Sequence, residues 1–477
     1  MNKIRTIAKN TSWLLISQIL SYLLIFFATI YSAKYLGVEN FGILSLSIAF
    51  TSIFVVFTDL GLSTLTIREV SRNKSLKSKY LANFILFKIF LAIVMFFFTF
   101  VAVSILSYPF QVRLIIYIMT LSVILNSFAG LISSIFQAYE KMEYLSMGAF
   151  ISNVLIFIGT IIAIELHLNV LIFAVVYLIA NLGLFVFYIM IYMLKFSLPS
   201  LELDITFWKD NIKLALPFGV TGVFVTIYYW IDSVMLSVMV NSDAVGFYNA
   251  AYRLVLVLLV IPSILNTVIF PVMSQFYVTS RESLKMVYEK YFKYMAILGI
   301  PLGFGVTLLA KKIVVLIFGV EYMGSVVAFQ ILVWSTTIIF MSGAFARLLE
   351  ASNKQMVITK ITGICAIVNI LLNFVFIPQF SYIGASIITV LTEILSFIFG
   401  LKAVSGMGYG FSRVEFIILI KVCISSFIMS MFIIIFYNFN VILLIVGSLL
   451  IYFMVLYCLN GWDNEDVKII DAILNKK

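Results

Sequence analysis

Six ionisable side chains lie inside long apolar stretches, where a charged group needs a chemical reason to be present. The stretch YYWIDSVMLSVMV, for example, places the carboxylate of Asp232 within an apolar run from Leu214 to Val240. A charged group at the centre of a membrane costs roughly 2.5–3.5 kcal/mol on insertion scales. We therefore expect such groups to face other parts of the protein or a water-filled cavity. The six are Asp59, Lys88, Asp232, Arg253, Glu393 and Lys421.

Two acid and base combinations among these residues could carry chemistry. Asp59 and Lys88 lie at similar depth on consecutive apolar runs, toward the predicted cytoplasmic side, so they could pair. Asp232 and Arg253 lie on two later consecutive runs, nearer the predicted outer side. In one interpretation these groups are structural ion pairs that hold helices together. In the other they line a polar route, where a base meets an anionic substrate and an acid responds to protons or Na⁺.

For two of the six residues, the sequence gives a weaker indication of a role in transport. Glu393 fits either interpretation, because its position in the sequence favours neither a structural nor a transport role. Lys421 lies on a later helix and is expected to extend toward the membrane surface or to pair with a lipid headgroup.

Several classes of enzyme lack the residues they require. His167 is the only histidine and lies in a predicted outer loop, so a Ser-His-Asp site has no support. The three cysteines lie in three different apolar runs, which favours neither disulfides nor a metal site. No Walker-type phosphate loop is present, so ATP hydrolysis is not expected. We predict a non-enzymatic protein without cofactor or metal. The energy for its activity would come from an ion gradient, the membrane potential or the gradient of its own substrate.

The elements that must position these residues are membrane-spanning helices. Of the 477 residues, 63% are hydrophobic and 11% are charged, whereas a soluble domain has about 25% charged residues. Apolar runs of about 20 residues, long enough to cross a bilayer as helices, recur along the chain. The sequence therefore predicts an all-α polytopic membrane protein with about fourteen transmembrane helices. Their approximate ranges are 12–33, 43–65, 81–106, 112–137, 145–164, 168–194, 214–240, 250–276, 292–317, 326–348, 357–377, 383–403, 414–437 and 439–459.

The distribution of basic residues predicts the orientation. With the N-terminus in the cytoplasm, the outer segments hold only Lys34, Arg113, Lys311 and Lys312 of the 31 Lys and Arg residues. Apart from three within spans, the others fall in the inner segments, as the positive-inside rule requires. Both termini are therefore expected in the cytoplasm.

A short internal repeat suggests two related halves. ENFGILSL begins at Glu39 and DAVGFYNA begins at Asp243, and both follow one pattern of acidic, apolar, glycine and polar positions. Six predicted spans separate the copies, so both halves would enter the membrane from the same side. This predicts two six-helix lobes related by a pseudo-two-fold axis along the membrane normal, plus two extra helices.

The predicted domain boundaries follow from the spans and the repeat. The N-terminal lobe is 1–194, a cytoplasmic linker is 195–213, the C-terminal lobe is 214–403, the two additional helices are 404–460, and a cytoplasmic tail is 461–477.

Several segments resemble one family of membrane transporters. The N-terminal signature is AKYLGVENFGILSLSIAF (33–50) followed by DLGLSTLTIREVSR (59–72). Later blocks are FQAYEKM (136–142), IDSVMLSVMVNSDAVGFYNAAYRL (231–254) and FGVEYMGS (318–325). Together they resemble bacterial polysaccharide-repeat-unit flippases, the O-antigen (Wzx-type) translocases of the multidrug/oligosaccharidyl-lipid/polysaccharide (MOP) exporter superfamily.

The resemblance implies a function and a set of site residues. It implies that the protein moves undecaprenyl-pyrophosphate-linked oligosaccharide from the inner to the outer leaflet of the bacterial cytoplasmic membrane by alternating access. Cationic residues in a central cavity would hold the pyrophosphate, and the matching candidates are Lys88, Arg253 and Arg68. The candidates for coupling to H⁺ or Na⁺ are Asp232, Asp59 and Glu393.

The resemblance also bears on partners and on alternatives. Membrane lipids, a polysaccharide polymerase and a chain-length regulator are expected partners, and nucleic acid is not. A lipid II flippase would have the same topology, but span 1 has Gln18 and no arginine. A drug/cation antiporter of the multidrug and toxin extrusion type usually has twelve spans. A membrane polymerase or acyltransferase would need a large outer loop or a histidine within the membrane, and neither is predicted.

Overall fold

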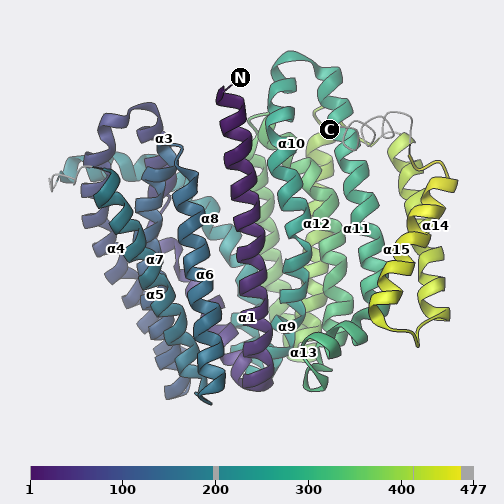
Figure 1. Ribbon diagram of the computed structural model, residues 1–477, viewed down its shortest axis with the longest axis horizontal. Helices are drawn as coiled ribbons and strands as arrows, with labels where there is room; N and C mark the ends of the chain where they lie inside the picture. The colour runs from purple at the N-terminus through teal and green to yellow at the C-terminus, as the bar shows by residue number, and fades with distance from the viewer. Residues whose placement is uncertain (1, 197–203, 412, 463–477) are drawn as a thin grey trace. The chain divides into compact units, whose positions relative to one another are not determined.

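The computed structural model describes residues 2–196, 204–411 and 413–462, and every regular element in them is a helix (Figure 1). Among these residues, 12 helices are long and apolar enough to cross a membrane. The predicted all-α polytopic class is confirmed. The chain divides into two compact units, Met1–Asn249 and Ala250–Lys477.

The described residues of the first unit form eight α-helices, one short 3₁₀ helix and the start of a ninth α-helix. In chain order they are α1 (Asn2–Phe54), α2 (Val56–Asp59), α3 (Leu62–Arg72), η1 (Lys74–Leu76), α4 (Lys77–Ile105), α5 (Phe110–Ala138), α6 (Met142–Glu165), α7 (Val170–Lys195), α8 (Ile205–Met239) and α9 (Ser242–Leu258).

The second unit starts within α9. It continues with α10 (Val260–Thr279), α11 (Arg281–Ile317), η2 (Val320–Tyr322), α12 (Ser325–Ala351), α13 (Gln355–Ser405), α14 (Arg413–Ile435) and α15 (Val441–Cys458).

Two long helices are interrupted by single residues in the left-handed region. α1 consists of two helical stretches that meet at Gly37, with φ 69°, and α13 of two that meet at Ser381, with φ 54°. Each interruption lies between two predicted spans. Twelve of the predicted ranges match observed helical stretches and extend at most two residues beyond them, whereas 43–65 and 250–276 each run across a break between helices. The total of fourteen crossings stays a prediction.

A proline also marks the boundary between α9 and α10. The first helix ends at Leu258 and the second begins at Val260, within the single span predicted over 250–276. Pro262 has no N–H for a helical hydrogen bond, and its ring clashes with the carbonyl of the residue four positions earlier, which is Leu258.

The helix α8 begins earlier than its apolar run. It starts at Ile205, whereas the predicted span begins at residue 214 and the predicted linker covers 195–213. Asp204 caps it, because its Oδ1 accepts a hydrogen bond from the Phe207 N–H at 2.8 Å. That bond, with Lys79 Nζ 3.1 Å away, lowers the pKa of Asp204. Residues 197–203 of the linker and 463–477 of the predicted tail lie outside the described residues.

Each unit has its own apolar core. In the first unit, buried side chains of α3, α4, α5 and α7 pack together around Phe84 and Phe136. In the second unit, α11, α12 and α13 enclose Phe292, Phe340 and Phe345. The two additional helices, α14 and α15, lie beside α11, and the Tyr452 hydroxyl donates to the Ile297 carbonyl at 2.8 Å (Figure 1). The lobe boundaries proposed from the sequence stay a prediction.

The two copies of the internal repeat contact each other within the first unit. A Cβ on Gly42 would overlap the carbonyl oxygen of Ser242, and a Cβ on Gly246 would overlap that of Val38. Val38 and Ser242 occupy the same place in the two copies, four residues before each glycine. The contact is therefore reciprocal, as expected for two like segments that pack about a local two-fold axis.

Candidate functional site

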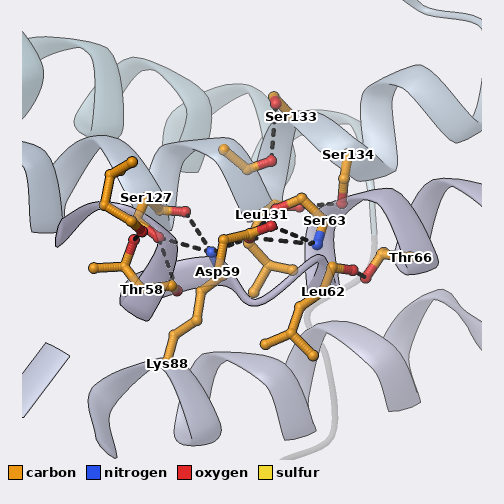
Figure 2. A network of polar contacts seen from close by, with 12 residues as sticks. Thr58, Asp59, Leu62, Ser63, Thr66, Lys88, Ser127, Leu131, Ser133 and Ser134 are labelled. Carbon is orange, nitrogen blue, oxygen red and sulfur yellow. Dashed lines mark hydrogen bonds and ion pairs between the residues drawn. The ribbon is translucent and has the colours of Figure 1, made fainter. Parts of the chain in front are cut away.

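A buried ion pair joins three segments of the first unit (Figure 2). Lys88 on α4 has a side chain that is only 1% exposed, and its Nζ lies 2.6 Å from Oδ1 of Asp59. The same ammonium donates to the backbone carbonyl of Ser127 on α5 at 3.1 Å and to its hydroxyl at 2.7 Å. An ammonium has three N–H donors. All three therefore have acceptors in this network.

The carboxylate of Asp59 is placed by a break in the chain. Leu60 and Gly61 both adopt left-handed backbone conformations, with φ 46° and 85°, and they separate α2 from α3. After the break, the backbone N–H and the hydroxyl of Ser63 both donate to Asp59, at 3.3 and 2.5 Å. The carboxylate thus lies at the N-terminus of α3, where the helix dipole favours a negative charge.

A glycine on α8 allows that helix to lie against the break. A Cβ on Gly219 would come within 2.9 Å of the carbonyl oxygen of Leu60. The ion pair, the break and α8 therefore form one closely packed assembly within the first unit.

The two members of the ion pair differ in accessibility. The Asp59 side chain is 31% exposed, whereas that of Lys88 is almost completely covered. In this conformation Lys88 neutralises Asp59 and links α4 to α5. An anionic substrate could contact the ammonium only by replacing Asp59 as its partner.

A second buried acid lies at the α8–α9 junction. Asp232 is 3% exposed, and its Oδ2 accepts a hydrogen bond from the Tyr248 hydroxyl at 2.7 Å. Beside it, the side-chain amide of Asn249 donates to the Ser233 hydroxyl at 3.0 Å. Sequence reasoning missed Tyr248 and Asn249. The available signal was their position directly after Gly246, in the second copy of the repeat.

The internal repeat distinguishes this acid from its counterpart. The offset that relates Asp243 to Glu39 relates Asp232 to Ala28 and Tyr248 to Leu44. Both counterparts are buried and apolar, with exposures of 1% and 3%. The hydrogen-bonded acid and tyrosine therefore belong to the second copy alone.

The remaining candidate residues lie on α3, α9, α13 and α14. Arg68 on α3 pairs with its neighbour Glu69, with its Nε 2.7 Å from the carboxylate. Arg253 is partly buried on α9, five residues after Tyr248, and Glu393 is buried on α13. Lys421 on α14 donates from its Nζ to the Asn460 carbonyl at 2.8 Å, after the end of α15. Its expected extension toward the membrane surface or a lipid headgroup stays a prediction.

The described residues contain no group of three or more His, Cys, Asp or Glu side chains that could hold a metal ion.

Comparison with protein families gives two matches. Residues 7–277 match the family described as polysaccharide biosynthesis protein. Residues 217–375 match the MatE family. These families consist of transporters, so the prediction of a non-enzymatic protein is confirmed.

Three curated relatives are archaeal proteins. An uncharacterized membrane protein of Methanocaldococcus jannaschii is 26% identical over 89% of this chain and 89% of its own length. A probable low-salt glycan biosynthesis flippase of Haloferax volcanii is 24% identical over 35% of each chain. A second probable flippase of that organism is 26% identical over 41% of this chain and 40% of its own. The two flippases thus match over less than half of their length.

Solved structures establish the fold. The lipid II flippase MurJ, in an inward closed conformation, superposes with a TM-score of 0.78 at 18% identity, over 94% of this chain and 98% of its own. An inward-facing multidrug transporter of the MATE family superposes with a TM-score of 0.67 at 13% identity, over 81% and 95%. The chain has the fold that these MOP superfamily members share.

Proposed function

The chain belongs to the polysaccharide biosynthesis protein family, and from this premise we propose that it is a flippase for lipid-linked oligosaccharides. The substrate would be an oligosaccharide repeat unit on undecaprenyl pyrophosphate, moved from the inner to the outer leaflet of the cytoplasmic membrane. The product would serve the synthesis of a surface polysaccharide. The names of two archaeal relatives, both probable flippases, support this class of activity.

The observation that carries the proposal is the buried pair of Asp59 and Lys88 on helices of membrane-spanning length. A pyrophosphate cannot cross bare hydrocarbon, because an unpaired charge there is too costly. The flippase must therefore offer a cation within the membrane, while the lipid tail can remain in the bilayer. Lys88 is such a cation, and Asp59 keeps it neutralised when no substrate is bound.

In the proposed mechanism, the substrate binds cationic side chains and a coupling ion acts on acidic ones. The pyrophosphate takes the place of Asp59 at Lys88, with Arg68 and Arg253 as further cationic contacts. Asp232, together with Asp59 and Glu393, responds to H⁺ or Na⁺ and so biases which side of the membrane is open. Tyr248 donates a hydrogen bond to Asp232 and so holds that carboxylate in place.

Complementation tests the proposed function. The full chain is expressed in a strain that lacks its own repeat-unit flippase, and surface polysaccharide is quantified. We expect restored polymer with the wild-type chain and reduced polymer with Lys88→Ala and with Arg253→Ala at equal membrane abundance. Lys360→Ala, at an exposed position, is the control. Normal polymer in both site variants would refute the pyrophosphate role.

A drug/cation antiporter is the second candidate, because residues 217–375 match the MatE family. That function predicts increased resistance to cationic dyes and unchanged surface glycan when the chain is expressed. Measuring dye susceptibility and glycan in the same strains separates the two candidates.

A further inference from the structure

A basic pocket lies at one end of the second unit. It has a volume of about 490 Å³ and is formed by the end of α11 and the turn between α14 and α15. Its polar lining includes Lys311, Lys312, Asn438 and Asn440. No Asp or Glu is among the lining residues, so the two lysines are not neutralised within the pocket.

One of these lysines is held in place by the opposite wall. Lys312 Nζ donates to the carbonyl of Phe439 at 2.7 Å and lies 4.8 Å from the centre of the Tyr437 ring. Both contacts are favourable for an ammonium. They also show that the end of α11 and the α14–α15 turn lie at the same end of this unit. Lys311, in contrast, is exposed at the pocket.

The pocket also has an apolar border. Leu316 on α11 is 60% exposed, and Phe439 in the turn is 56% exposed. Both belong to the pocket lining, and both adjoin helices long and apolar enough to cross a membrane. A cationic region beside exposed apolar side chains fits an amphiphile with an anionic head.

The distribution of Lys and Arg residues between the predicted inner and outer segments makes these two lysines unusual. They are two of only four Lys or Arg residues in the predicted outer segments, where the positive-inside rule disfavours cations. We propose that this pocket binds the phosphate group of a lipid at the outer surface of the membrane. Lys311 and Lys312 would contact the phosphate, and the acyl or polyprenyl chain would lie along Leu316 and Phe439.

The test is lipid binding to the detergent-purified full chain, measured by native mass spectrometry with phosphatidylglycerol and with zwitterionic phosphatidylcholine. We expect preferential binding of phosphatidylglycerol. A Lys near an anionic surface contributes about fivefold in affinity, so Lys311→Gln should weaken binding by that factor and Lys311→Gln/Lys312→Gln further. The matched control is Lys354→Gln/Lys360→Gln, which removes the same charge at exposed positions on the predicted cytoplasmic side.

The single variant Lys311→Gln separates a loss of lipid binding from a folding defect. Lys312 contacts the turn, so its loss could disturb the pocket, whereas Lys311 has an exposed side chain. Equal phosphatidylglycerol binding by the wild type and Lys311→Gln would overturn the proposal, as would an equal loss in the control.

Competition identifies the source of the phosphate. Farnesyl pyrophosphate, a short polyprenyl pyrophosphate, is added to the complex with phosphatidylglycerol. Displacement that depends on Lys311 would assign the pocket to a pyrophosphate-bearing lipid, and retention of phosphatidylglycerol would assign it to a membrane phospholipid. Because binding is measured without transport, failure here would leave the flippase proposal intact.

Discussion

At the scale of single residues, Lys88 shows how a charge is accommodated within an apolar helix. Its ammonium has one carboxylate and two oxygens of Ser127 as acceptors, so every donor is satisfied. Removing one member of a buried ion pair leaves the other without compensation, which is usually more costly than removing both. The pair is therefore structural in this conformation, and substrate binding would have to exchange its partners.

Replacing Lys88 with an uncharged residue of similar length should expose this cost. We expect Lys88→Met to destabilise the protein by roughly 3 kcal/mol, at the lower end of values for broken buried pairs because Asp59 is partly exposed. Thermal unfolding in detergent measures the effect. Adding Asp59→Asn to Lys88→Met should restore part of the loss, and an unchanged Tm in the single variant would contradict the structural role.

Asp232 leads to a functional prediction of a different kind. Its buried carboxylate is the candidate for ion coupling, so Asp232→Asn should abolish the dependence of transport on a pH or Na⁺ gradient in vesicles. Tyr248→Phe, which removes only the donated hydroxyl, should shift the ion concentration of half-maximal transport. Tyr31→Phe, at an exposed position, should leave both properties unchanged. Unaltered gradient dependence in Asp232→Asn would end the coupling proposal.

At the scale of elements, interruptions in the helices position the site. Leu60 and Gly61 end one helix and start another, which brings the Asp59 carboxylate to the N-terminus of α3. A continuous helix would have used the same backbone N–H groups internally, and Ser63 could not then donate its N–H to Asp59. The break therefore creates an anion position within a membrane-crossing segment.

The reciprocal contact of Gly42 and Gly246 gives a prediction for pairs of elements. Both glycines lie against backbone carbonyls, which cannot move aside as a side chain can. Gly42→Val and Gly246→Val should each destabilise the protein by more than the 1–3 kcal/mol that is typical of overpacking. The yield of folded protein after solubilisation and its thermal unfolding measure this.

Two other glycines serve as controls for that experiment. A Cβ added at Gly130 or Gly222 would meet no atom within 4 Å. Gly130→Ala and Gly222→Ala should therefore keep wild-type stability. If the substitutions at Gly42 and Gly246 were tolerated equally well, the close contact between the repeat copies would be contradicted.

At the scale of the whole molecule, the distribution of basic residues predicts an orientation that can be tested directly. In a variant in which Cys365, Cys423 and Cys458 are replaced by serine, a new cysteine is introduced at Lys311 or at Lys354. A membrane-impermeant maleimide should label Lys311→Cys in intact cells and Lys354→Cys only after permeabilisation. The opposite pattern would reverse the predicted topology.

Much of the fold could be predicted from the sequence because a bilayer imposes strict requirements. Only helices and closed barrels satisfy the backbone in hydrocarbon, so long apolar runs specify helices. The polar start of α8 was not predicted, because a cap at Asp204 extends the helix beyond the apolar run and hydrophobicity does not reveal caps. The predicted span 43–65 likewise ran across α2 and the first turn of α3, because hydrophobicity does not reveal the backbone break at Leu60 and Gly61.

The candidate site was predictable in part. Asp59 and Lys88 were recognisable as a potential pair, since an isolated charge in hydrocarbon needs a partner. The repeat drew attention to the segment that contains Tyr248, but buried tyrosines are common and the sequence does not show which hydroxyl reaches an acid. The role of Tyr248 depends on the packing of α8 against α9 after the turn at Val240.

The sequence alone determined the helical class, the apolar runs, the repeat and the charges that need partners, because these depend on composition and on the solvent. Tertiary structure alone decided which partners those charges have. Ser127 is far from Lys88 along the chain, yet it supplies two of the three acceptors. Hydrogen bonds depend on distances of about 3 Å, and only the packed helices bring residues of distant segments that close.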